Sequence, residues 1–206
     1  MKACKIYGKV QLGKDTIADD YTVIGYPATD DGTRIGEKGL IRSHTVIYSG
    51  NRIGSCFQTG HHVNIRECNE IGDNVSIGTG SVVEHHVKIE DNVRIHSNAF
   101  ICEFTVLRKG CWIGPGVIMT NAKYPASVRS KENLTAPEIG EGAIIGGNAS
   151  VLPGVRIGRN ALIGAGSVVT KDIPENAVAS GNPAKVINTR DMLRYPDGSR
   201  AYEGER

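Results

Sequence analysis

Aromatic residues are scarce in this chain of 206 residues, where Phe, Trp and Tyr together make up 5% of the sequence. A globular core normally relies on large aromatic side chains, which bury a great deal of apolar surface each. Here the apolar content consists mainly of 22 isoleucines and 18 valines, and both residue types favour strands. The composition therefore indicates a strand-rich protein with a core of branched aliphatic side chains.

An excess of charge of one sign is also missing. The 24 basic and 22 acidic residues leave a net charge of +2, which excludes the electrostatic signature of a nucleic-acid-binding or anionic-membrane-binding protein. Residues 1–15 lack an apolar run long enough for a signal peptide, and no stretch approaches the length of a transmembrane span. We therefore expect a cytoplasmic protein with neither nucleic acid nor membrane as a partner.

Paired cysteines are absent as well. The five cysteines are an odd number and include no Cys-x-x-Cys pair, which argues against a disulfide framework and against a cysteine zinc site. We expect them to be small, partly buried residues in a reducing compartment, and we expect no metal.

What the sequence does contain is a repeat of six residues. Of the fifteen residues taken at steps of six from Ile35 to Met119, twelve are Ile or Val, whereas chance would give about three. Glycine often follows the aliphatic residue, as at Ile53-Gly54 and Ile113-Gly114. The series is Ile35, Ile41, Ile47, Ile53, Thr59, Ile65, Ile71, Ile77, Val83, Ile89, Ile95, Ile101, Leu107, Ile113 and Met119, and it resumes as Ile139, Ile145, Val151, Ile157, Ile163 and Val169.

A period of six excludes the common regular structures. An apolar stripe on a helix needs steps of three and four, and a simple strand alternates with period two. Short strands joined by tight turns with Gly, Asn or Asp fit the pattern, with three strands in each coil of 18 residues. Coils would stack about 4.8 Å apart with the aliphatic column inside. The sequence therefore predicts an all-β fold, a parallel β-helix, whose handedness the period leaves open.

Two segments break the repeat. Residues 120–138 are polar and contain two prolines, so they predict a loop inserted into the solenoid, where functional residues often lie. The repeat ends near Asn188, and residues 188–206 form a charged tail that could hold a short helix from Asp191 to Tyr195. We therefore expect one β-helix domain over 1–187 and a separate tail over 188–206.

The segment from Trp112 to Ile187 carries a specific resemblance. It begins WIGPGVIMTNAKYP and continues, after the loop, as IGEGAIIGGNASVLPGVRIGRNALIGAGSVVTKDIPENAVASGNPAKVI. This sequence resembles the hexapeptide-repeat acyltransferase superfamily, whose members fold as left-handed β-helices, form homotrimers and use acetyl-CoA or related thioesters. The resemblance implies a left-handed coil, a homotrimer and acetyl-CoA as the cofactor.

Within that superfamily the chain most resembles the nucleotide-amino-sugar N-acetyltransferases. In these proteins a Thr-Asn-x-x-Tyr-Pro loop follows an Ile-Gly-Pro coil, and Thr120, Asn121, Tyr124 and Pro125 match it. The resemblance implies transfer of an acetyl group to the amine of a nucleotide-linked amino sugar. It also implies that Asn121 and Tyr124 close over this acceptor.

Stacking residues 18 apart converts the sequence into a map of polar columns. One predicted column holds Glu67, His85, Glu103 and Asn121, with Arg66 and Glu84 beside it, and a second holds His44, His62, Gly80 and Asn98. Side chains on adjacent coils are close enough to hydrogen-bond. We expect the two columns to line grooves between the subunits of a trimer from opposite sides, with Glu103 and Arg66 among the acceptor-binding residues.

Transfer to an amine or a hydroxyl requires a proton acceptor or an oxyanion-binding group near the reacting atoms. Five of the histidines are candidates for the base. The resemblance favours Asn98, with His96 beside it, as the group that orients the amine or binds the oxyanion. Our second choice is His61 with Glu67, and the third is His85.

The cofactor site is predicted from the late coils. Their small residues suit the long, mostly neutral pantetheine arm, and the resemblance implies that Gly147, Ala165 and Thr170 contact it. Lys171 and Lys185 would then bind the phosphates of CoA as charged donors.

Three alternatives remain open at this stage. O-acetylation of a sugar or another small hydroxyl acceptor needs the same fold, and the fold does not choose the acceptor. A metal lyase resembling the γ-class carbonic anhydrases would need three histidines that converge on one zinc ion. The resemblance to that family would require two histidines five residues apart, and no two histidines here have this spacing. A non-catalytic assembly module would need neither the inserted loop nor a groove of small residues.

Overall fold

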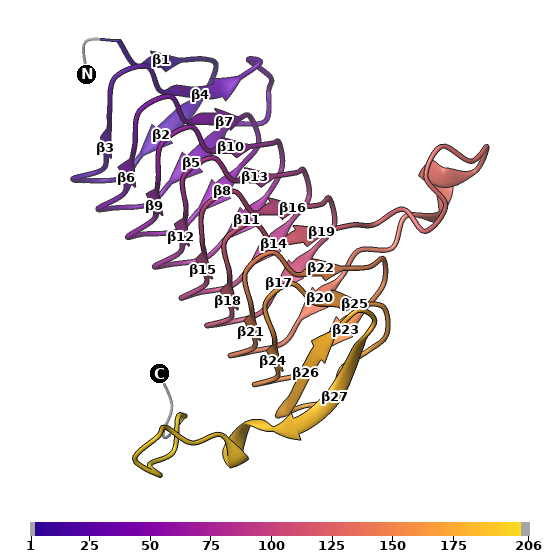
Figure 1. The fold of residues 1–206 in the computed structure, drawn as a ribbon. Helices are drawn as coiled ribbons and strands as arrows, with labels where there is room; N and C mark the ends of the chain where they lie inside the picture. The colour runs from indigo at the N-terminus through magenta and orange to yellow at the C-terminus, as the bar shows by residue number, and fades with distance from the viewer. Residues whose placement is uncertain (1–2, 203–206) are drawn as a thin grey trace.

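The chain winds into a left-handed solenoid in which each coil adds one strand to each of three sheets (Figure 1). The structure is a computed structural model and describes residues 3–202. Adjacent strands of a sheet come from adjacent coils, so that Asn64 pairs with Val46 on one side and with Val82 on the other. The predicted fold, a left-handed parallel β-helix with one inserted loop and a short tail, is confirmed.

The three sheets, here called A, B and C, are defined by their strands. Sheet A contains β1 (Lys5–Ile6), β4 (Val23–Tyr26), β7 (Val46–Tyr48), β10 (Asn64–Ile65), β13 (Val82–Val83), β16 (Phe100–Ile101), β19 (Ile118–Met119), β22 (Ser150–Val151) and β25 (Val168–Val169). Sheet B contains β2 (Val10–Leu12), β5 (Thr33–Ile35), β8 (Arg52–Ile53), β11 (Glu70–Ile71), β14 (Lys88–Ile89), β17 (Val106–Leu107), β20 (Glu138–Ile139) and β23 (Arg156–Ile157). Sheet C contains β3 (Ile17–Ala18), β6 (Leu40–Ile41), β9 (Gln58–Thr59), β12 (Ser76–Ile77), β15 (Arg94–Ile95), β18 (Trp112–Ile113), β21 (Ile144–Ile145), β24 (Leu162–Ile163), β26 (Ala177–Gly181) and β27 (Ala184–Thr189).

The turns between these strands explain the abundance of glycine and asparagine. Within one coil, His62, Cys68 and Asn74 have φ angles of 56°, 59° and 55°, which place one left-handed residue at each corner. Asparagine and especially glycine adopt this conformation at low cost. Gly146 meets a second need, because a Cβ atom there would lie 2.5 Å from the backbone nitrogen of Ala165 on the next coil.

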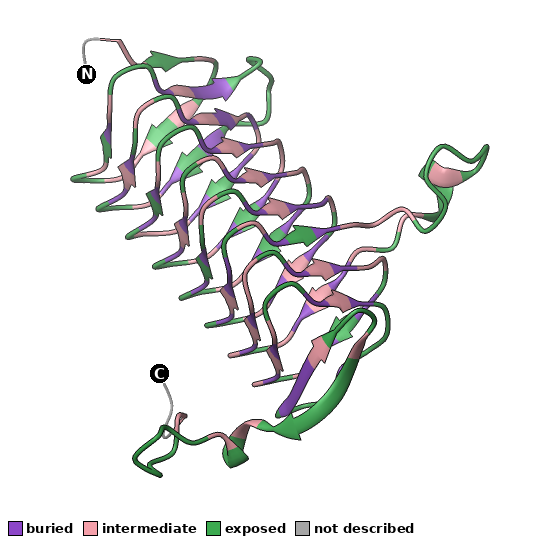
Figure 2. Ribbon diagram, viewed as in Figure 1, coloured by how far each residue is buried: buried purple, intermediate pink, exposed green. Residues whose placement is uncertain are grey.

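The repeated aliphatic residues form the core. Ile41, Ile47, Ile65, Ile101 and Ile113 are completely buried, and in Figure 2 buried positions recur on successive coils. Each such side chain contributes roughly 1.5–3 kcal/mol through burial. A continuous aliphatic column therefore holds the coils together without an aromatic cluster.

The outer faces of the sheets differ in chemistry. Sheet B presents charged side chains to solvent: Arg34, Arg52, Glu70, Lys88 and Arg156. Sheet A instead presents a mainly apolar column on the same side of its strands, formed by Val46, Val82, Phe100, Ile118 and Val168 and interrupted by the polar Asn64 and Ser150. In a single chain these residues are only half-buried or exposed, and Ile118 is 40% exposed.

The inserted loop leaves the solenoid between β19 and β20 as a projecting arm (Figure 1). Its base is closed by a hydrogen bond of 2.9 Å from the backbone nitrogen of Thr135 to the carbonyl of Asn121. The arm carries a short 3-10 helix, η1 (Ser130–Asn133), and the side chain of Val128 at its far end is fully exposed.

The C-terminal region differs in detail from the prediction. Strands β26 and β27 form an antiparallel hairpin, and β27 continues past residue 187, where we expected the β-helix to end. The helix expected from Asp191 to Tyr195 is wrong in extent, since the structure has a 3-10 helix, η2, only over Arg190–Met192. Leu193 is extended, with φ −73° and ψ 133°, and ends this helix. The last four residues of the expected tail, 203–206, lie outside the described residues.

Candidate functional site

A pocket of about 730 Å³ lies where the inserted loop leaves sheet A. It is built at the turns that follow the sheet A strands, which we call the A/B corner. Buried and half-buried apolar side chains form much of its wall, and two carboxylates reach it from successive coils. The lining residues are Glu84, Phe100, Cys102, Glu103, Met119, Thr120, Asn121, Ala122, Lys123, Pro125, Leu152, Pro153 and Thr170.

Arg66 organises the upper part of the A/B corner. Its guanidinium donates two hydrogen bonds to Glu67, of 2.9 and 3.1 Å, and lies 3.6 Å from Glu84. It also lies over the ring of Tyr48, at 5.1 Å from the centroid. Partial burial raises the pKa of Glu67, but hydrogen bonds from Arg66 and from its own backbone outweigh this and lower the pKa below its ordinary value. Glu67 is therefore a salt-bridged carboxylate.

His85 and Glu103 meet on adjacent coils, as the predicted column requires. His85 Nε2 lies 2.5 Å from Glu103 Oε2, and both side chains are about a quarter exposed. Asn121, the next member of the column, donates from Nδ2 to the carbonyl oxygen of Glu103 at 3.4 Å. The structure thus brings three polar groups of the predicted site together at the pocket.

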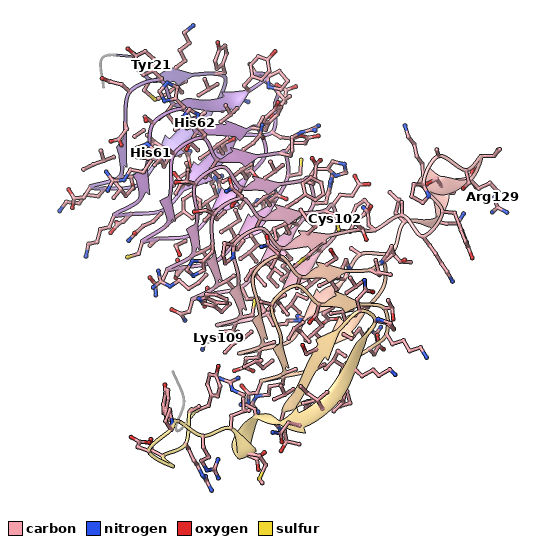
Figure 3. All side chains as sticks on the ribbon, in the orientation of Figure 1. Tyr21, His61, His62, Cys102, Lys109 and Arg129 are labelled. Atoms are coloured by element: carbon pink, nitrogen blue, oxygen red, sulfur yellow. The ribbon has the colours of Figure 1, made fainter. Side chains whose placement is uncertain are left out.

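The other predicted catalytic residues lie at a different corner, between sheets C and A, which we call the C/A corner. His61 Nδ1 is 2.8 Å from Ser43 Oγ, and the His96 ring packs 4.4 Å from the ring of Trp112. Asn98 is the left-handed turn residue, with φ 59°, and its Oδ1 covers Gly80 on the preceding coil. Within one chain, sheet A separates these residues from the pocket. Figure 3 likewise shows His61 and His62 far from Cys102.

The predicted cofactor residues divide between the same two corners. Gly147 and Ala165 are turn residues of the C/A corner, where the nitrogen of Gly166 donates to the carbonyl of Gly147 at 2.8 Å. The C-terminal hairpin packs onto this corner and carries Lys185, opposite Ser180. Thr170 lines the pocket at the A/B corner, and Lys171 is exposed beside it.

Tyr124, predicted to close over an acceptor, is 67% exposed on the arm and does not line the pocket. Conversely, Cys102 and Leu152 line the pocket but were not predicted at all, and Glu84 was predicted beside the first column without a role of its own. All three follow directly after a buried aliphatic residue of sheet A. The spacing of 18 between Glu84, Cys102 and Thr120 was the signal that could have found this column.

Two of the five cysteines, Cys102 and Cys111, are buried, while Cys4 and Cys68 are half-buried and Cys56 is exposed. Cys102 is 3% exposed and Cys111 is 0% exposed. Desolvation raises the pKa of Cys102 to about 11 and raises the pKa of Cys111 still more, whereas the exposed Cys56 lies in water. Because the thiolate is the reactive form, we expect a maleimide at pH 8 to label Cys56 rapidly and to label Cys102 and Cys111 only after denaturation. Mass spectrometry of labelled peptides measures this, and rapid labelling of Cys111 in the folded protein would contradict the burial.

Over residues 3–202, no three His, Cys, Asp or Glu side chains lie close enough together to hold a metal ion. In the same range, no helix is long and apolar enough to cross a membrane. The histidines form separate pairs, His44 with His62 and His85 with His86, whose ring centroids are 4.7 and 5.0 Å apart.

Comparison with known proteins gives consistent matches. The family model described as bacterial transferase hexapeptide (six repeats) matches residues 70–103 and 136–171. The galactoside O-acetyltransferase of Lactococcus lactis is 36% identical over 136 residues, 63% of this chain and 61% of that protein. The bifunctional protein GlmU of Thermotoga petrophila is 33% identical over 205 residues, 92% of this chain and 43% of that protein. The chain thus spans less than two thirds of each of these curated relatives.

Among solved structures, LpxA of Acinetobacter baumannii shares the fold. It has a TM-score of 0.52 and 20% identity over 92% of this chain and 71% of that one. The repeat of six, the three-sheet solenoid and the matched family model agree with one another. This chain belongs to the hexapeptide-repeat, left-handed β-helix acyltransferase superfamily.

Proposed function

We propose that this protein is a CoA-dependent acyltransferase that acetylates the amino group of a nucleotide-linked amino sugar. The observation that carries the proposal is the Glu103–His85 pair at a pocket beneath a loop that begins Thr120-Asn121-Ala122-Lys123-Tyr124-Pro125. Free cysteines and balanced charge fit a cytoplasmic enzyme.

The working unit in this proposal is a homotrimer. Sheet A carries the apolar column and is flanked by the two corners that hold the predicted site residues. Copies that bury sheet A would bring the C/A corner of one chain toward the A/B corner of the next. Asn98 and Glu103 stand five residues apart on one coil, at either end of β16, so a threefold axis along the solenoid would keep them at similar height.

Acetyl-CoA would bind along the same groove. The pantetheine arm is narrow and would fit between the small residues Gly147 and Ala165 of one copy and Thr170 of the next. Lys171 and Lys185 supply cations for its phosphates. Acetyl-CoA held by these residues would supply the thioester carbonyl for the acceptor to attack.

The acceptor's ammonium group first releases one proton to water, and the neutral amine then attacks this carbonyl and loses one further proton as its bond to carbon forms. We assign the proton to Glu103, whose Oε1 atom has no hydrogen bond among the described residues, while His85 holds Oε2. The proton then passes to the thiolate of CoA as the carbon–sulfur bond breaks. In this scheme the side chain of Asn98 from the neighbouring copy donates to the oxyanion of the tetrahedral intermediate.

The chemistry of the pocket supports a basic acceptor. Glu84 and Glu103 both line it, and two carboxylates attract a primary amine, which is largely protonated in water. In this proposal the rest of the acceptor would contact Asn121, which lines the pocket, with Arg66 and Tyr124 outside its lining as further binding residues.

Transfer to a hydroxyl group is the second candidate, favoured by the relative from Lactococcus lactis, whose name is galactoside O-acetyltransferase. The same Glu103–His85 pair could deprotonate an alcohol. The two candidate functions differ in how much they need a general base, because an alcohol must be deprotonated to attack, whereas a neutral amine is already nucleophilic.

The test is thiol release from acetyl-CoA in the presence of UDP- and dTDP-amino sugars, amino acids and simple sugars. We expect release with an amino sugar and at least a tenfold loss in Asn98→Gly, since the oxyanion donor is removed. Glycine keeps the left-handed turn, as Gly80 does at the equivalent position, and Asn92→Gly is the matched control at another corner. Release with hydroxyl acceptors alone would support the second candidate. No release and no CoA binding by calorimetry would refute both.

A further inference from the structure

His85 is held on both sides of its ring. Its Nε2 atom lies 2.5 Å from Glu103 Oε2, and its Nδ1 atom lies 2.8 Å from Nδ1 of His86. His86 is exposed and follows His85 directly in the chain. The three side chains therefore form a continuous hydrogen-bonded row from the pocket to the surface.

The row has only a few possible arrangements of its protons. A carboxylate only accepts, so His85 Nε2 carries a hydrogen when Glu103 is ionised. The two Nδ1 atoms are close enough that one proton must lie between them. When both rings are neutral, this proton is bonded to Nδ1 of His86, and the Nε2 atom of His86 carries no hydrogen.

The local backbone and packing hold this arrangement in place. His86 is a left-handed corner residue, with φ 55°, which turns its side chain back toward His85. Phe104, at the corner of the next coil, packs against both rings with centroid distances of 5.7 and 5.9 Å. The charged groups facing the row are Glu67 and Glu84, with Arg66 between them.

We propose that His86 is a positioning residue for the transfer reaction. Its hydrogen bond fixes the tautomer of His85, which in turn aims one N–H at Glu103 and leaves the other carboxylate oxygen available to the acceptor. The inference rests on the proposed function and extends it to a residue that touches no substrate. Without His86, the ring of His85 can flip or carry its hydrogen on Nδ1, and the carboxylate loses its partner.

The kinetic test uses His86→Asn in the full chain. Asparagine suits the left-handed corner, as Asn74, Asn92 and Asn160 show at equivalent turns. We expect kcat to fall roughly tenfold with the KM for acetyl-CoA unchanged, and added imidazole to restore part of the rate. Lys38→Asn, at an exposed left-handed corner with φ 57° outside both polar columns, is the control and should keep the wild-type kcat. A wild-type kcat in His86→Asn would overturn the inference while leaving the proposed function intact.

A second measurement separates the two proposals if no acceptor is turned over. Nitrogen-15 NMR of the histidine rings reports which nitrogen of His85 carries the hydrogen, without any substrate. We expect protonation at Nε2 in the wild type and a mixture of tautomers in His86→Asn. An inactive wild type would refute the proposed function, and an unchanged His85 tautomer in the variant would by itself refute the role of His86.

Discussion

Replacing Glu103 by glutamine should lower the rate of acetyl transfer by roughly a hundredfold. Glutamine has nearly the same shape, and its amide oxygen can still accept the hydrogen from His85 Nε2, which lies 2.5 Å from the carboxylate. The variant therefore keeps the contact and removes only the ability to take a proton. Thiol release at saturating acetyl-CoA and acceptor measures the loss in kcat.

Two comparisons make this result specific. Glu70→Gln changes an exposed carboxylate on the outer face of sheet B, away from the pocket, and should leave the rate unchanged. The loss should also be larger with a hydroxyl acceptor than with an amine, because the alcohol depends more on the base. A rise in the acceptor's KM with an unchanged kcat would show that Glu103 only binds the acceptor, the role that the sequence suggested for it.

The sequence was sufficient to predict the coil and much of its register. Twelve of fifteen residues at a spacing of six predicted an inward column, and the positions from Ile41 to Ile113 within it are buried. A repeat of 18 also placed His85 above Glu103 and His44 beside His62, and these contacts are present. Period alone fixes such neighbours because each coil repeats the geometry of the last.

The repeat does not show whether a residue occupies its position for its side-chain chemistry or for its backbone conformation. Asn98 was chosen as a polar residue near the reacting atoms, but it also occupies a left-handed corner, where asparagine is favoured for the backbone alone. Cys102 and Leu152 were overlooked because apolar residues carry no chemical signal in sequence. Their place in the pocket depends on the direction in which the inserted loop leaves Met119. That direction is set by tertiary contacts.

Replacing Asn69 by leucine should lower the free energy of unfolding by about 3 kcal/mol. Asn69 is 1% exposed at the A/B corner, accepts from the backbone nitrogen of Val87 at 2.7 Å and donates to the carbonyl of Arg66 at 2.8 Å. Leucine fills a similar volume but leaves the buried N–H of Val87 without its acceptor. Chemical denaturation followed by circular dichroism measures the change. As a control, Ser76→Ala in strand β12 removes only an exposed hydrogen bond from Arg94 and should shift stability by less than about 0.5 kcal/mol.

Asn51 supplies a sharper version of the same experiment. It is fully buried one coil earlier, and its Nδ2 atom also donates to the carbonyl of Arg66 at 2.8 Å. Either single leucine variant leaves that carbonyl with one donor, whereas the double variant leaves it with none. The combined loss should therefore exceed the sum of the single losses by about 1 kcal/mol. Strict additivity would mean that water replaces the missing donors, and the asparagine ladder would then be a weaker link between coils than its burial indicates.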